Sequence, residues 1–189
     1  MSITSLKTGT TGLSAALDNN YMEPIATTVV GSGGVASIAF NDIPQIYKHL
    51  QIRGIGRTAN AVTDENIVLQ FNFDNASNYS THWLNGNGSA ASSNVDTPFT
   101  KIPFCRTTGA SSTALMFGAT VCDILDYTNT NKYKTVRALS GHDQNGSGVI
   151  QLRSGFWRST SAITSITISN DQIANIAEYT RFSLYGIKG

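Results

Sequence analysis

The chain has 189 residues, with 13 Lys and Arg against 12 Asp and Glu, for a formal charge of +1 at pH 7. Charged residues make up 13% of the sequence, about half the usual share in soluble domains, and 22 Thr, 20 Ser and 16 Asn take their place. This near-neutral charge argues against a basic surface of the kind that binds nucleic acids or anionic membranes. No apolar run is long enough for a transmembrane helix.

Residues 1–24 form a segment rich in Thr, Ser and Gly, with few apolar side chains such as Leu6, Leu13 and Leu17. It contains no sustained apolar stretch after its single Lys, so its pattern is not that of a secretory signal. A segment of this composition cannot fold alone. We therefore expect an extended N-terminal arm over residues 1–24, either disordered or ordered on a neighbour, and one domain over residues 25–189.

Alternating apolar and polar residues recur along the rest of the chain. Each such run predicts a half-buried strand, because successive side chains of a strand point to opposite faces. The apolar residues that share a face are, in chain order, Leu50 and Ile52; Ile67, Leu69, Phe71 and Phe73; Leu115, Phe117, Ala119 and Val121; Ile150, Leu152 and Phe156; and Phe182, Leu184 and Gly186.

Turn residues separate these runs, for example at 31–34, 85–88 and 145–148, where Asn and Gly adopt positive φ at little cost. Only residues 11–20 and 169–178 have a pattern that would allow two or three helical turns. About eight or nine short strands rich in β-branched residues favour an all-β fold. We predict an antiparallel two-sheet β-sandwich that is jelly-roll-like.

The sequence offers few groups for chemistry, and we predict no enzyme activity, no catalytic residues, no metal site and no cofactor. Ser140, His142 and Asp143 are too close in sequence for the geometry of a catalytic triad. Asp123 and Asp126 would serve glycoside hydrolysis only if folding placed them correctly. A separate pair, Cys105 and Cys122, is interpreted as free thiols, whose proximity the sequence does not determine.

One stretch, residues 78–88, combines aromatic side chains with amides beside a turn. Aromatic faces and neighbouring hydrogen-bonding groups are how proteins hold sugars or neighbouring subunits. The residues that would form a surface, glycan or subunit contact are Tyr79, His82, Trp83, Asn85 and Asn87. The interpretation that we favour over such a contact is that Trp83 and Tyr79 only cover an edge of the sandwich.

Several short sequence segments, taken together, resemble those of a group of small structural proteins of tailed bacteriophages, of the tail-fibre or minor tail protein type. The resemblance covers about residues 25–188. The segments that carry it are Val30–Gly34, Ile38–Pro44, Tyr47–Arg53, Phe71–Ser80, Leu84–Gly88 and Phe182–Lys188.

The resemblance implies a non-enzymatic virion protein that is made in the host bacterial cytoplasm and assembles as a homo-oligomer, with a trimer favoured. Residues 1–24 lie outside the resemblance, and for them we expect docking on other virion proteins or on a sister subunit. A further hypothesis is that the Tyr79–Asn87 stretch contacts a host surface glycan. Two alternatives stay open: a head decoration or cement protein on the capsid exterior, and a carbohydrate-binding module. Copy number per particle separates tail from head.

Overall fold

A computed structural model describes residues 21–189 as two antiparallel β-sheets packed face to face. The strands are β1 (Met22–Val29), β2 (Ser37–Phe40), β3 (His49–Gly56), β4 (Asp64–Phe71), β5 (Tyr79–Gly86), β6 (Ala91–Phe99), β7 (Ile102–Thr108), β8 (Gly118–Leu125), β9 (Lys134–Asp143), β10 (Gly148–Trp157), β11 (Ile166–Asn170) and β12 (Arg181–Ile187). Within residues 21–189, no helix has the length and apolar character needed to cross a membrane.

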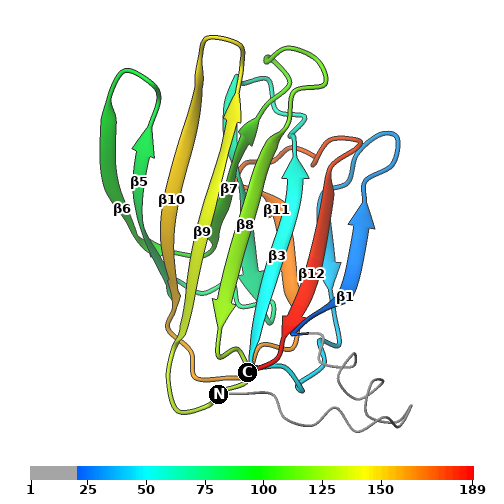
Figure 1. Ribbon diagram of the computed structural model, residues 1–189, viewed down its shortest axis with the longest axis vertical. Helices are drawn as coiled ribbons and strands as arrows, with labels where there is room; N and C mark the ends of the chain where they lie inside the picture. Colours follow the sequence, from blue (N-terminus) through cyan, green and yellow to red (C-terminus); the bar gives the residue numbers. More distant parts are fainter. Residues whose placement is uncertain (1–20) are drawn as a thin grey trace, which may run out of the picture.

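The strand order confirms the predicted all-β sandwich and gives it jelly-roll connectivity. One sheet has the order β1-β12-β3-β8-β9-β10-β5-β6 and the other the order β2-β11-β4-β7 (Figure 1). Without the hairpins β5–β6 and β9–β10, two four-stranded sheets remain, β1-β12-β3-β8 and β2-β11-β4-β7. Along the chain their strands alternate between the sheets, except at the step from β4 to β7, which is the arrangement of a jelly roll.

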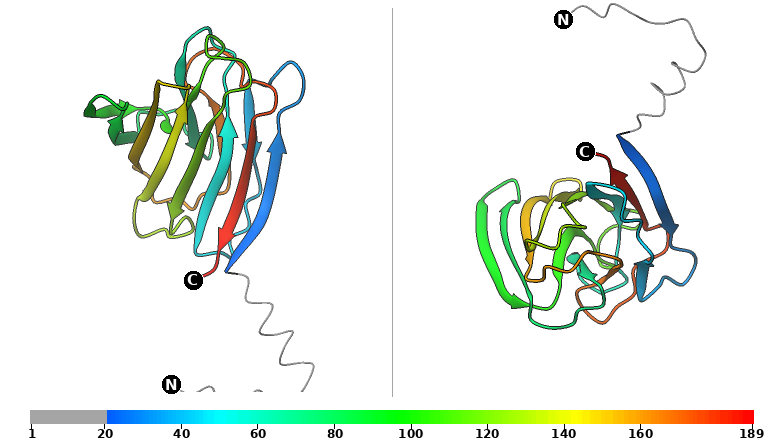
Figure 2. Two further views of the ribbon diagram at one scale, coloured as in Figure 1. Left: turned by 45° about the horizontal axis from the view of Figure 1, so that its top comes forward. Right: turned by 90° about the horizontal axis from the view of Figure 1, so that it is seen from below.

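Two inserted hairpins make one sheet twice as wide as the other. The β5–β6 hairpin lies between β4 and β7 in sequence, and the β9–β10 hairpin lies between β8 and β11. Both hairpins extend the same sheet, where β10 pairs with β5 in an antiparallel ladder from Ile150↔Gly86 to Trp157↔Tyr79. Figure 2 shows this sheet curving from β1 at one edge to β6 at the other.

The core lies between the two sheets and is closed by aromatic side chains where β10 meets β5. Trp157 stacks on Tyr79 with ring centroids 6.2 Å apart and packs against Phe71 at 5.4 Å. The indole Nε1 of Trp157 donates a hydrogen bond to Asp74 at 2.7 Å, which satisfies the polar atom of this buried ring. The same core also contains buried aliphatic residues from both sheets, among them Leu50, Ile52, Ile67, Leu69, Ile102, Ile124, Ile166, Ile168 and Leu184.

Several expected elements need correction. Residues 169–178 do not form a helix: Ser169 and Asn170 end β11, and the Asn170 side chain then accepts the Gln172 N–H at 2.6 Å in an Asx turn. The run that starts at residue 65 is β4, but it ends at Phe71, and Phe73 has a positive φ and is exposed. Residues 78–88, which the sequence placed beside a turn, are mostly strand β5, and the turn follows this strand.

The expected N-terminal arm is only partly within the described residues. Strand β1 begins at Met22 and pairs with β12, so the sandwich starts inside the segment 1–24. Residues 1–20, with the helix considered for residues 11–20, lie outside the described residues.

Candidate interaction surface

Four aliphatic side chains lie side by side on the outer face of the wide sheet, the face that points away from the core. The ladders between β5, β10, β9 and β8 pair Leu84 with Leu152, Leu152 with Leu139, and Leu139 with Val121. Residues directly opposite each other in an antiparallel sheet share a face. These four residues are called the apolar row below.

Three of the four members of the apolar row are exposed to solvent although they are large hydrophobic residues, and the fourth, Val121, is half-buried. Leu84, Leu139 and Leu152 are 53%, 46% and 47% exposed, and Ile150, next to the row, is 61% exposed. The row itself ends at Ser93 on β6 and Arg53 on β3, opposite Leu84 and Val121. The exposed Val95 and Ile55 lie diagonally beyond its two ends, opposite His82 and Ala119. A contiguous apolar patch on a soluble protein is a mark of an interaction site, whereas scattered surface hydrophobics are not.

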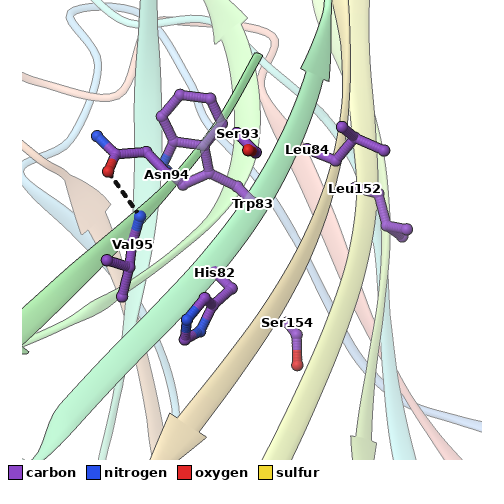
Figure 3. A pocket seen from close by; sticks show the side chains of 8 residues that line it. All are labelled: His82, Trp83, Leu84, Ser93, Asn94, Val95, Leu152 and Ser154. Atoms are coloured by element: carbon purple, nitrogen blue, oxygen red, sulfur yellow. Dashed lines mark hydrogen bonds between the residues drawn. The ribbon is translucent and has the colours of Figure 1, made fainter. Parts of the chain in front are cut away.

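Two shallow hollows open along the apolar row. One, of about 420 Å³, is lined by His82, Leu84, Val95, Leu152 and Ser154 among others, and Figure 3 shows Leu84 beside Leu152 and His82 near Ser154. The other, of about 500 Å³, includes Val121, Leu139 and Ile150 in its lining. Their shallow, apolar character suits contact with another surface better than enclosure of a small molecule.

A polar row runs parallel to the apolar row on the same face, and each of its members lies two residues from the apolar residue of its strand. It contains His82, Ser154, Arg137 and Asp123, from β5, β10, β9 and β8 in that order. The Arg137 guanidinium lies 3.6 Å from the Asp123 carboxylate, which also accepts a hydrogen bond from Gln51 at 2.7 Å. The apolar row therefore has a hydrogen-bonded, charged border on one side.

The sequence predicted the buried face of β8 and β10 incorrectly. On β10, Ile150 and Leu152 point outward, and the inward positions are Gln151, Arg153, Gly155 and Trp157. Trp157 fixes this choice because it fills the core, and a strand's period of two then sets every other side chain. On β8 the inward set is Gly118, Thr120, Cys122 and Ile124, which leaves Ala119 and Val121 outside.

Small and polar residues are accommodated on the inner side of β10 for identifiable reasons. A Cβ atom at Gly155 would lie 2.7 Å from Ile102 Cγ2, so β7 packs directly onto the glycine. Arg153, only 4% exposed, contacts the Asp96 carboxylate at 3.0 Å and donates to Thr81 at 3.0 Å and to Gln151. This buried cluster fastens the β5–β6 hairpin to β10.

The structure does not gather the five predicted contact residues into one surface. Tyr79 is 2% exposed, and its hydroxyl accepts the Phe71 N–H at 3.1 Å, so it belongs to the core. His82 is exposed on the outer face, while Trp83 and Asn85 lie half-buried on the opposite face. Asn87 lies in the β5–β6 turn, where its side chain accepts the Ser89 and Ala90 N–H groups.

The two carboxylates considered for hydrolysis are held by separate cations. Asp123 pairs with Arg137 on the outer face, whereas Asp126 lies in the turn after β8 beside Lys48, at 3.1 Å, and Lys132. Hydrogen bonds from these two lysines lower the pKa of Asp126 to about 2. A carboxyl group with so low a pKa is a poor general acid at neutral pH.

The other titratable groups are also dispersed. His49 accepts the Asp126 N–H at 2.9 Å, while His142 is buried near the Asp64–Arg106 ion pair and desolvation lowers its pKa. Over residues 21–189, no cluster of three His, Cys, Asp or Glu side chains has a metal-binding arrangement. Cys105 and Cys122 are free and buried.

The apolar row was missed at the sequence level, although a signal for it exists. Strands β9 and β10 carry large apolar residues at both odd and even positions: Val136 and Leu139 on β9, and Leu152 and Trp157 on β10. A strand with apolar residues at both odd and even positions has two apolar faces, which indicates that both faces are covered by other parts of the structure. Among residues 21–189, side chains of the sandwich cover only one of these faces.

Comparison of the chain with protein-family models, with curated proteins and with solved structures finds no match in any of the three.

Proposed function

We propose that this chain is a non-enzymatic structural subunit that works as a homo-oligomer, and that the assembly it helps to build is a bacteriophage virion, in the tail or tail fibre. The observation that carries the first part is the solvent-exposed apolar row on the outer face of β5, β10, β9 and β8. The second part is supported by the sequence segments that resemble phage structural proteins.

The distribution of titratable groups favours a structural role over catalysis. Catalysis by acids and bases requires such groups to converge on one substrate position. Here Asp123, Asp126 and Glu65 are each engaged in a separate set of contacts with neighbouring side chains. A rigid sandwich with a wide exposed sheet is suited to forming intersubunit contacts instead.

The virion proposal includes predictions that the described residues do not address. Contacts of residues 1–24 with other virion proteins stay a prediction, as does attachment to a host glycan. Because Tyr79 is in the core, any glycan contact of the predicted group would fall to His82 on the outer face, to Trp83 and Asn85 on the other face, or to the exposed Asn87 in the turn.

Quantitative mass spectrometry of purified virions of the phage that encodes the chain tests this function. We expect the chain to co-purify with the particles at between three and a few dozen copies, which corresponds to a tail or fibre position. Hundreds of copies would contradict the tail position and support the head decoration alternative. Absence from the particles would contradict a virion role altogether.

A further inference from the structure

We propose that a second copy of this chain covers the apolar row, packed face to face about a two-fold axis that runs parallel to the strands between β9 and β10. This inference rests on the proposed role as a homo-oligomer and specifies its interface. The two-fold arrangement replaces the trimer that the sequence resemblance favoured.

The apolar row is matched to itself by this axis. The four strands involved lie symmetrically about it, with β10 and β5 on one side and β9 and β8 on the other. Rotation by 180° therefore places Leu152 opposite the partner's Leu139, and Leu84 opposite the partner's Val121. An interface around a two-fold axis must be self-complementary in this way.

Steric matching continues in the neighbouring row of the outer face. There the order across the strands is Gly86, Ile150, Gly141 and Ala119. The same rotation places the large Ile150 side chain opposite the partner's Gly141. Alternation of large and small residues across two facing sheets allows the side chains to interdigitate.

The polar row discriminates between this axis and the other possible two-fold axis. The axis parallel to the strands places His82 opposite the partner's Asp123, and Arg137 opposite the partner's Ser154, so no like charges meet. An axis along the apolar row would instead place Arg137 and Asp123 against the partner's Gly141 and Ala119. That arrangement would desolvate two charged groups without new hydrogen bonds, which is unfavourable.

The available area is sufficient for a stable dimer. Three strands lie on each side of the axis, β6, β5 and β10 against β9, β8 and β3. With a strand spacing of about 4.8 Å and about eight residues per strand at about 3.3 Å each, they present roughly 750 Å². Stable interfaces bury about 800 Å² on each partner.

Size-exclusion chromatography with light scattering tests the interface. The 20.2 kDa chain should elute as a species of twice that mass, and Leu152→Arg should reduce the mass to that of one chain. Leu152 points outward, so the variant should keep the far-ultraviolet spectrum and melting transition of a folded sandwich. Ile173→Arg, at a fully exposed position outside the strands, is the matched control and should stay dimeric.

Cysteine pairing tests the register of the two copies. Equal amounts of His82→Cys and Asp123→Cys proteins, mixed and mildly oxidised, should form a covalent heterodimer, because the axis places these positions opposite each other. Each variant alone should stay unlinked, since two copies of residue 82 would lie on opposite sides of the axis. The native thiols, Cys105 and Cys122, are buried and do not compete.

The inference is overturned by a monomeric or trimeric wild-type protein, by a dimer that Leu152→Arg leaves intact, or by a dimer that gives no mixed disulfide. These outcomes are distinct from failure of the virion role. A monomer that is present in virions would overturn the interface alone, whereas a two-fold dimer that is absent from virions would overturn the virion role alone.

Discussion

At the scale of single residues, the Glu65 carboxylate shows how this fold satisfies a buried charge without a cation. Glu65 is 7% exposed and accepts three hydrogen bonds of 3.0 Å, from the Thr58 hydroxyl and the Asn60 and Asn170 amides. The three donors come from the segment after β3 and from the end of β11. One carboxylate therefore joins β4 to segments that are distant in sequence.

We expect Glu65→Ala to lower the free energy of unfolding by about 1–3 kcal/mol, because it leaves buried donors without an acceptor. Urea unfolding followed by tryptophan fluorescence measures the change. Glu178→Ala, at a half-exposed carboxylate, is the control and should change stability by less than about 0.5 kcal/mol. Equal effects of the two substitutions would contradict the structural role of Glu65.

The low pKa of the Asp126 carboxyl group predicts that the free energy of unfolding depends on pH. Its pKa is about 2 in the folded protein, below the value of about 3.9 in an unfolded chain. The stabilisation by its ionised form is thus fully present above pH 4 and lost as the pH falls through about 2. Asn tolerates the positive φ of this position, so Asp126→Asn changes mainly the charge.

At pH 7 we expect Asp126→Asn to cost about 0.5–1 kcal/mol, because solvent screens exposed ion pairs. Urea midpoints of the two proteins should converge as the pH is lowered from 4 to 2. A difference that stays constant over this range would show that the charge of Asp126 contributes nothing.

The two cysteines should be inert in the native protein. Burial raises the pKa of Cys105 to about 12 and raises that of Cys122 well above its ordinary value, and the thiolate is the reactive form. We expect Ellman's reagent to label neither thiol at pH 8 under native conditions, and both after denaturation. Fast labelling of the folded protein would contradict their position in the core.

At the scale of elements, the attachment of the β5–β6 hairpin depends on Arg153. We expect Arg153→Met to leave Asp96 without its ion pair and to loosen this hairpin. Hydrogen exchange in peptides covering residues 79–99 should become about tenfold faster, which corresponds to ~1.4 kcal/mol. Peptides from β3 and β12 should keep their protection from exchange. The control is Arg181→Met, at an exposed position of β12, and it should leave the exchange of the whole protein unchanged.

Sequence periodicity was sufficient for strands with one solvated face. Leu50 and Ile52 on β3, and Phe182 and Leu184 on β12, are buried as expected, because the other face of these strands carries mostly polar side chains. The sandwich class followed from such runs and from the turn residues between them. The register and order of the strands did not follow, because they depend on long-range pairing.

Periodicity failed on the inserted hairpins and on β8, and this is where the apolar row lies. Strand β10 has apolar residues on both faces, so the pattern alone does not determine which set is buried. Trp157 and Gly155 decide it through packing against Phe71 and Ile102, residues of other strands. For the same reason Tyr79 was expected at a surface, although its aromatic partners bury it.

At the scale of the whole molecule, the inserted hairpins convert a jelly roll with two equal sheets into one with a broad outer face. The β5–β6 and β9–β10 hairpins supply three of the four residues of the apolar row. These hairpins extend the sheet and also create its exposed apolar surface. Their presence is most simply explained if they serve assembly.

Cryo-electron microscopy of intact virions that carry the chain tests the proposed assembly most directly. We predict symmetrically placed density for the sandwich, in which the outer face of β5, β10, β9 and β8 is packed against the same face of a second copy. Particles without this density, or with that face open to solvent in every copy, would contradict the account.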